Sequence, residues 1–180
     1  MEKETTKLEL VMHYIIWKCQ DPTQLGATKL NKILWYSDMH HYMESGKSIT
    51  NVTYIKRQHG PVPNKNDFNS ARESLVRSKK IAVTKDLYHG YSQFLFVALE
   101  KPDISSLSPD EVSIIDTSVE EICKNYTASS ISERTHGMLW ELAEIGEEIP
   151  LYAAFSMRFG EITEEDMKWA KEEANRLNMG

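Results

Sequence analysis

The stretch YIKRQHGPVPNK, residues 54–65, joins a short strand to a helix through a corner that contains two prolines. Pro61 and Pro63 fix their own φ angles, and the residue before each proline is restricted to extended geometry. Alternating and β-branched residues predict a strand over 51–56, and apolar residues at helical spacing predict a helix with a basic outer face over 64–80. The corner is therefore a rigid connector between these two elements.

Two helices are predicted before this corner. Residues 8–19, LELVMHYIIWKC, are apolar on almost every side and predict the most deeply buried helix of the protein. The second helix begins with Thr28 as its cap, carries the amphipathic stretch WYSDMHHYM in its centre and ends at Gly46. A helical core therefore precedes the corner.

Further strands follow the basic helix. The stretch IAVTKDLYHGYSQFLFVALE, residues 81–100, predicts two strands around a turn at His89-Gly90. Together with the strand at 51–56 they make a small antiparallel sheet of two or three strands. The predicted fold class is α+β, mainly α, with a helical core and this small sheet.

The last third of the chain is again predicted to be helical. In SPDE, residues 108–111, the serine caps a helix, the proline takes its first position and the glutamate completes a capping box. TASSISERTHG, residues 127–137, is expected to break this helix before a short helical piece, MLWELA, at 138–143. A last helix is predicted to start at Thr163.

Composition indicates one globular domain, since the 180 residues are 41% hydrophobic and 27% charged. No apolar run is long enough to span a membrane, and the charged start MEKETTKLEL lacks a signal-peptide pattern, so we expect a cytoplasmic protein without a membrane partner. Cys19 and Cys123 have no CxxC spacing, and we interpret them as buried core thiols in a reducing compartment.

Charge is distributed unevenly along the chain. Residues 56–85 contain eight basic and two acidic side chains, whereas residues 141–173 contain ten acidic and three basic ones. Two interpretations remain open: two solvated faces of opposite sign, or a basic region that receives an acidic partner. The net charge of -6 disfavours generic nucleic-acid binding.

The sequence has six histidines but none of the patterns that mark a catalytic or metal site. HExxH, CxxC, a GxSxG elbow and a glycine-rich phosphate loop are all missing. His40 and His41 would point about 100° apart on a helix, and His13 is expected to be a hydrogen-bonded core histidine. We therefore predict no catalytic residue, metal or cofactor, and a protein that is not an enzyme.

The order of elements supports one alternative. From Thr28 to Leu99 the predicted helix, strand, basic helix, strand, turn and strand follow the order of winged-helix DNA-binding domains. The basic segment 56–85 falls inside this run. The alternative function is thus a DNA-binding regulator, with nucleic acid as the less favoured partner.

A family resemblance is carried by two stretches, residues 28–68 and residues 132–143. They contain Lys29-Leu30, Lys32, Gly46, Gly60-Pro61-Val62, Thr135-His136 and Trp140. In these positions, and over residues 8–155 as a whole, the chain resembles the Panacea domain, the family of SocA-like antitoxins and phage-associated proteins. Tyr54 is a departure, because members often carry Trp shortly before Gly-Pro-Val.

The resemblance implies an intracellular antitoxin that neutralises a cognate protein toxin by direct contact. In some relatives it also implies an adaptor that delivers the toxin to an ATP-dependent protease. It implies no cofactor and no chemistry of its own. It further implies a single Panacea-like domain over 1–180, with its core at 8–155 and the helix at 163–178 as an extension.

The corner and nearby aromatic side chains form the hypothetical partner-binding set. Because the corner is rigid, its flanking side chains could make preorganised contacts. The set consists of Arg57, His59, Gly60, Pro61 and Val62, with Trp35 and Trp140 as exposed aromatics.

Two other roles remain open for these residues. Gly60-Pro61 could serve only to position the next helix, with Arg57 and His59 bonding helix ends inside the fold. A hydrolase or transferase that uses His59 or His136 would require both in one accessible cleft beside a carboxylate.

Overall fold

The computed structural model of the chain describes residues 5–88, 91–135 and 143–152. Three helices, α1, α2 and α4, pack against one another at its centre, and α3 packs on α1. In chain order the elements are α1 (Lys7–Cys19), the 3-10 helix η1 (Pro22–Gln24), α2 (Ala27–Ser45), β1 (Tyr54–Arg57), β2 (Gly60–Pro63), α3 (Lys65–Arg77), β3 (Ile81–Tyr88), β4 (Tyr91–Ala98), α4 (Pro109–Asn125) and α5 (Ala128–Arg134).

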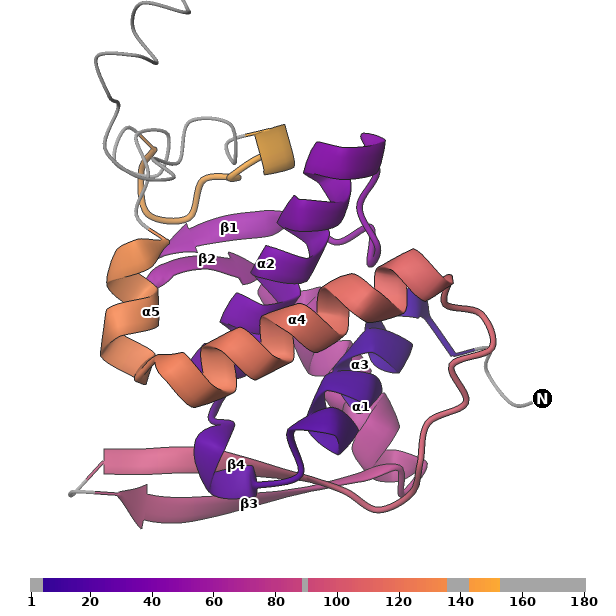
Figure 1. Cartoon of the computed structure of the whole chain (residues 1–180). Helices are drawn as coiled ribbons and strands as arrows, with labels where there is room; N and C mark the ends of the chain where they lie inside the picture. Colours follow the sequence, from indigo (N-terminus) through magenta and orange to yellow (C-terminus); the bar gives the residue numbers. More distant parts are fainter. Residues whose placement is uncertain (1–4, 89–90, 136–142, 153–180) are drawn as a thin grey trace, which may run out of the picture.

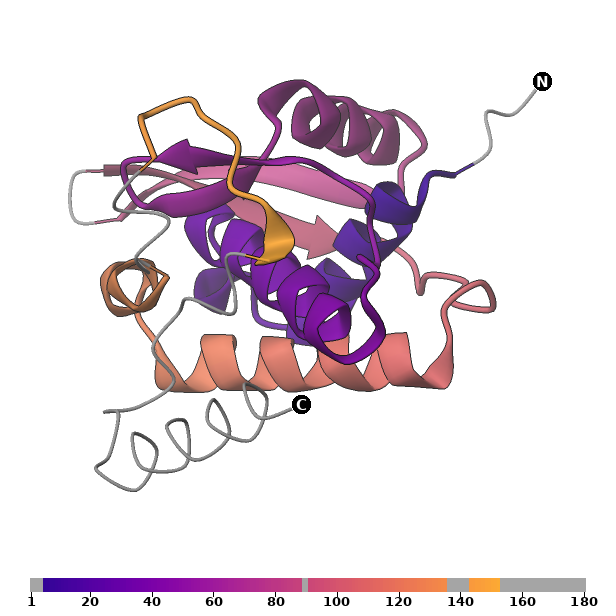
Figure 2. The same cartoon turned by 90° about the horizontal axis from the view of Figure 1, so that it is seen from above.

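The helices lie in layers between two hairpins. Figure 1 shows β1–β2 above and β3–β4 below, with α1, α2 and α4 between them. Seen from above, α3 and α4 lie on opposite sides of the molecule and enclose α1 and α2 (Figure 2). This arrangement buries α1 from Leu8 to Ile16, as expected for the apolar stretch at 8–19.

Two helix starts illustrate where the sequence signals succeed and fail. Ser108 caps α4 and Glu111 completes the predicted capping box. In contrast, α2 begins at Ala27 after Gly26, so the prediction of Thr28 as the cap is wrong by two positions. Gly46 ends α2 as predicted, in a left-handed conformation with φ of 71°.

The prediction of an α+β, mainly α fold is confirmed, but the strands form two separate two-stranded sheets. β1 pairs with β2, which is the stretch that we predicted to be a corner, and β3 pairs with β4. The actual turn is the dipeptide Gln58-His59. Because β1 does not pair with β3 or β4, the sheet expected from the winged-helix order of elements does not form.

The hairpin register explains how a strand can contain two prolines. Arg57 and Gly60 face each other across the turn, so the pairs Lys56↔Pro61 and Tyr54↔Pro63 fall on positions that do not exchange ladder hydrogen bonds. The missing proline N–H groups therefore remove no bond between β1 and β2. The extended geometry that each X-Pro pair imposes is the geometry that the strand needs.

The structure corrects and extends the expectations for the C-terminal third. Residues 127–137 were expected to break the helical pattern, yet α5 occupies Ala128–Arg134 with Thr127 as its cap. The helices predicted at 138–143 and from Thr163 lie outside the described residues, except for Ala143. In the part of the chain that is described, no helix has the length and apolar character needed to cross a membrane.

Candidate functional site

A buried lysine marks the point where three distant segments meet. Lys32 of α2 is 1% exposed, and its Nζ donates to the carbonyl of Pro61 in β2 at 3.5 Å. A Cβ added to Gly60 would overlap with Lys32 Nζ and with Oγ1 of Thr135, which follows α5. Gly60 also has a φ of 101°, which disfavours other residues. Three positions of the sequence resemblance, 32, 60 and 135, thus form one buried junction.

The buried position weakens the proton affinity of Lys32. Desolvation of the ammonium lowers its pKa to about 7. The neighbouring Thr135 hydroxyl donates to the carbonyl of Ser132 at 2.7 Å. Among the described residues Lys32 has no ion-pair partner, so a large share of molecules carry a neutral amine here at neutral pH.

A buried carboxylate fixes the hairpin to α2. Oδ1 of Asp38 accepts hydrogen bonds from the backbone N–H groups of Ile49 and Thr50, each at 2.8 Å. Oδ2 accepts from the hydroxyls of Thr50 and Tyr54, the latter at 2.7 Å. Burial raises the pKa of Asp38, and these four hydrogen bonds oppose the rise. Through these hydrogen bonds Asp38 attaches β1, and the residues before it, to α2.

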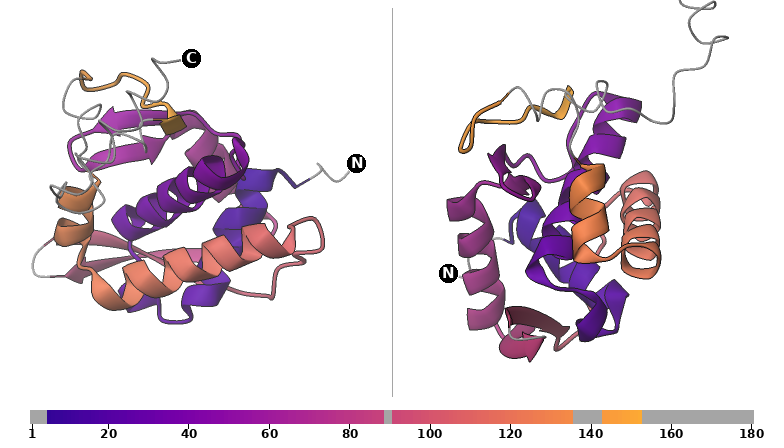
Figure 3. Two further views of the ribbon diagram at one scale, coloured as in Figure 1. Left: turned by 45° about the horizontal axis from the view of Figure 1, so that its top comes forward. Right: turned by 90° about the vertical axis from the view of Figure 1, so that its left-hand side faces the viewer.

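The free edge of β1 is covered by the segment at 143–149. Lys56 donates its backbone N–H to the carbonyl of Glu147 at 2.7 Å and its Nζ to the carbonyl of Ala143 at 2.9 Å. Ile149 donates its N–H to the carbonyl of Tyr54 at 2.8 Å. Figure 3 shows this segment running beside the hairpin. The exposed acidic side chains of Glu147 and Glu148 therefore lie close to a basic part of the chain.

The turn of the hairpin faces solvent. Arg57, Gln58 and His59 are exposed. The side chains of Arg57 and His59 make no hydrogen bond or ion pair with another described residue, so these side chains do not brace the fold within that part of the chain. The interpretation that they bond helix ends inside the fold is therefore not supported.

A surface hollow of about 260 Å³ adjoins this turn, and we call it the hairpin hollow. It is lined by Asn31, Arg57, Val62, Pro63, Lys65 and Phe68. Oδ1 of Asn31 is buried and has no hydrogen-bond partner in the described structure. The hollow thus combines two cationic side chains with an apolar lining, which suits a partner that presents a carboxylate.

The structure corrects part of the predicted partner-binding set. Trp35 was expected to be an exposed aromatic, but it is 1% exposed and packs edge-on against Tyr54 with ring centroids 4.9 Å apart. Gly60 and Pro61 are also buried, whereas Val62 is partly exposed. Trp140 lies outside the described residues.

Other positions of the sequence resemblance lie in the core or at its edge. Leu30 is fully buried in the core. Lys29 is largely buried and donates to the carbonyl of Cys123 at 3.3 Å. His136 lies outside the described residues, so the proximity to His59 that the enzyme hypothesis would require is not tested. His13 is confirmed as a buried histidine, with Nε2 3.0 Å from the carbonyl oxygen of Glu100.

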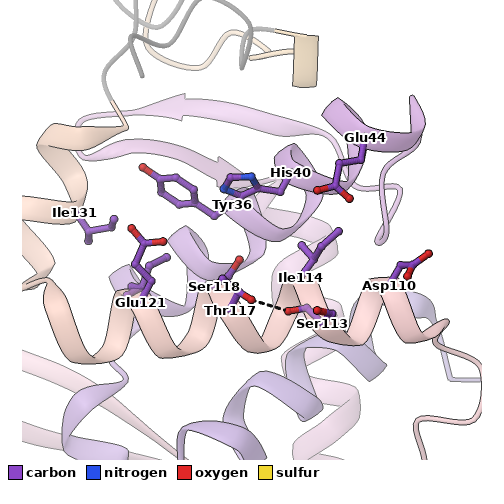
Figure 4. A pocket seen from close by; sticks show the side chains of 11 residues that line it. Tyr36, His40, Glu44, Asp110, Ser113, Ile114, Thr117, Ser118, Glu121 and Ile131 are labelled. Atoms are coloured by element: carbon purple, nitrogen blue, oxygen red, sulfur yellow. Dashed lines mark hydrogen bonds between the residues drawn. The ribbon is translucent and has the colours of Figure 1, made fainter. Parts of the chain in front are cut away.

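A second hollow of about 310 Å³ lies between α2, α4 and α5 (Figure 4). Tyr36 and His40 line it from α2 with stacked rings, and Glu121 and Ser118 line it from α4. Burial raises the pKa of Tyr36 to about 12, against the smaller opposing effect of the Arg134 guanidinium. Across the described residues, no group of three or more His, Cys, Asp or Glu side chains could hold a metal ion.

Sequence reasoning missed Asp38 and Asn31. Asp38 follows Leu34 by four positions and precedes the buried Met39, so it falls on the apolar stripe of α2. A carboxylate at such a position signals a buried hydrogen-bond network. Asn31 gives no comparable signal, because its unused oxygen depends on the packing of the hairpin over α2.

The fold and these sites define a small α+β protein in which the β1–β2 hairpin presents cationic side chains beside the hairpin hollow. Comparison with family models finds a match to the antitoxin SocA-like, Panacea domain over residues 30–141, and the chain belongs to this family. The resemblance seen in the sequence is thereby confirmed. Comparisons with curated proteins and with solved structures found no match.

Proposed function

We propose that this protein is an antitoxin that neutralises a cognate protein toxin by direct contact through the turn of the β1–β2 hairpin and the hairpin hollow. The observation that carries the proposal is the solvent-facing pair Arg57 and Lys65 at the hairpin hollow, beside its apolar lining. Membership of a SocA-like antitoxin family supports a toxin as the partner.

Rigidity favours the hairpin as a binding element. Asp38 fixes β1, the junction around Lys32 fixes β2, and two prolines restrict the backbone. A surface that is already ordered loses less conformational entropy when it binds. Affinity at this site therefore depends on side-chain chemistry at the turn and not on folding of the loop.

Charge defines the partner surface that would fit. Arg57 and Lys65 can pair with carboxylates, and the apolar side chains of Val62 and Phe68 can receive an aliphatic or aromatic group between them. The nearby Glu147 and Glu148 would repel a strongly acidic surface that extends past the hairpin. The expected partner thus presents a small acidic patch with an apolar centre.

Co-expression with the product of the neighbouring gene tests this proposal. The wild-type protein should restore growth, and Arg57→Glu together with Lys65→Glu should weaken binding by about 10–100-fold and abolish the rescue. Arg77→Glu is the matched control, because Arg77 is exposed and lies near the other end of α3, about 18 Å from Lys65.

Each outcome decides a separate part of the proposal. A neighbouring product that is not toxic, or that stays toxic beside the wild-type protein, would rule out the antitoxin function. Rescue by the double variant at wild-type affinity would rule out the hairpin hollow as the interface. The half-life of the toxin in the rescued cells distinguishes two modes: it shortens if the protein delivers the toxin to an ATP-dependent protease and stays unchanged if contact alone neutralises it.

A further inference from the structure

The two cysteines of the chain meet at the ends of two helices. Cys19 is the last residue of α1, and Cys123 lies in the last turn of α4. Their sulfur atoms are 3.2 Å apart although the residues are 104 positions apart in the sequence. Both thiols are free and pack against the core, as expected, but they are only half-buried, and nothing in the sequence indicated that they are adjacent.

A surface hollow gives small molecules access to both thiols. It has a volume of about 620 Å³ and is lined by the two cysteines together with polar and charged side chains, among them Lys18, Gln24, Asp116 and Lys124. Lys18 is held by Asp116 at 2.7 Å, so this charged rim is ordered. A small polar reagent can thus approach the sulfur atoms from solvent.

The surroundings distinguish the two sulfurs. The hydrogen bond between the two thiols, in which either sulfur can be the donor, lowers the pKa of Cys123 and raises the pKa of Cys19. The Lys29 ammonium, which donates to the carbonyl of Cys123 at 3.3 Å, acts to lower the pKa of both cysteines and so favours a thiolate at this pair. Cys123 therefore has the character of an attacking thiolate, with Cys19 as the neighbouring thiol that can resolve a mixed disulfide.

We propose that Cys19 and Cys123 form a redox-active dithiol that a small disulfide of the glutathione class converts reversibly into an intramolecular disulfide. The Cys123 thiolate attacks one sulfur of oxidised glutathione, whose S–S bond breaks and releases one glutathione thiolate. The Cys19 sulfur, after losing its proton, attacks Sγ of Cys123 and releases the second glutathione. Two electrons and the two thiol protons thus pass from the protein to two molecules of reduced glutathione.

The geometry requires little movement. A disulfide bond is about 2.05 Å long, so sulfurs that start 3.2 Å apart must approach by about 1.1 Å. The bond would link the ends of α1 and α4, which already pack against each other. Because it closes a loop of about a hundred residues, it should raise the midpoint of thermal unfolding by about 5–15 °C.

Incubation of the purified full chain with excess oxidised glutathione tests the proposal. Intact mass should fall by about 2 Da with loss of both titratable thiols and no adduct, and dithiothreitol should reverse the change. Since the chain has only two cysteines, a monomer that has lost both thiols without an adduct contains this one bond. Thermal unfolding of the same samples gives a second readout.

Single variants separate the two roles. Cys19→Ser should accumulate one glutathionyl group on Cys123, and Cys123→Ser should react more slowly, at its remaining Cys19. Wild-type protein that keeps both thiols, retains glutathionyl adducts or forms disulfide-linked dimers would overturn the proposal. These measurements use no toxin, so their outcome is independent of the antitoxin function.

Discussion

The two hairpins of this protein are attached to the core by different interactions. β1–β2 is attached through buried polar groups, namely the Asp38 network, the Lys32 junction and the backbone bonds to residues 143–149. β3–β4 is attached mainly through apolar side chains, with Ile81 and Phe96 buried in the core. A cation–π contact also joins this hairpin to α3, with Arg72 Cζ 6.0 Å from the centre of the Phe94 ring.

The difference concerns how precisely each hairpin is positioned. Apolar contacts are non-directional, so β3–β4 can tolerate exchange of similar side chains. Buried polar groups require partners at fixed distances and are costly when a partner is removed. β1–β2 is therefore the hairpin whose position is specified most exactly, and it is also the one that carries the exposed Arg57 and His59.

The largest expected effect follows from removal of the Asp38 carboxylate. Asp38→Ala leaves the Tyr54 hydroxyl, the Thr50 hydroxyl and two backbone N–H groups without their acceptor, and should lower the free energy of unfolding by about 3–5 kcal/mol. Urea unfolding measures this loss. Amide exchange should increase in β1–β2 before it increases in β3–β4.

Asp67→Ala is the control for that measurement, because Asp67 is an exposed carboxylate in the first turn of α3. Its loss should cost less than about 1 kcal/mol through the helix dipole alone. Equal losses for the two variants, or uniform exchange in both hairpins, would contradict attachment of β1–β2 through Asp38.

A smaller effect is expected from a methyl group at the buried junction. Gly60→Ala introduces a Cβ that overlaps with Lys32 and Thr135, at a position where φ is 101°. It should lower the free energy of unfolding by about 2–4 kcal/mol. Gly46→Ala is the matched control, since Gly46 also has a positive φ but no atom within 4 Å of its Cβ position, and should cost about 1 kcal/mol. The difference between the two midpoints of urea unfolding measures the junction itself, and no difference would mean that backbone strain explains both.

The sequence predicted β3–β4 and the helices more accurately than it predicted β1–β2. Apolar periodicity and capping residues are local signals, and they located α1, α4 and the strands around His89-Gly90. The stretch from Gly60 to Pro63 has no such signal, because two prolines indicate a turn unless the pairing register is known. The register depends on contacts to α2 and residues 143–149, which are distant in sequence.

The candidate site was predictable in part for the same reason. Arg57 and His59 were singled out because a charged pair beside a rigid turn is visible in the sequence; both are exposed, and their role in partner binding stays a prediction. Trp35 was misjudged as exposed, since an aromatic residue in an amphipathic helix can face either way. The hairpin hollow and the pair of thiols exist only through tertiary packing.

The smallest expected effect concerns the proton on Lys32 and is visible as a pH dependence. The folded-state pKa of about 7 lies below the value of about 10.4 for an unfolded lysine, so the unfolded chain binds more protons between these pH values. The stability contribution of this group therefore rises with pH from 7 towards 10.4 and is flat below pH 7. Lys32→Met, which removes the amine and keeps an apolar chain of similar length, should lose this rise.

The difference between the two unfolding curves isolates the lysine from other titrating groups. Between pH 7.5 and pH 9, as working limits inside that window, the wild-type protein should gain up to about 1.4 kcal/mol per pH unit relative to the methionine variant. Below pH 7 the variant should be the more stable protein, since burial then carries the full cost of a desolvated ammonium. Parallel curves would mean that Lys32 stays charged in the folded protein. The junction would then have to provide hydrogen-bond acceptors for the ammonium in addition to the carbonyl of Pro61.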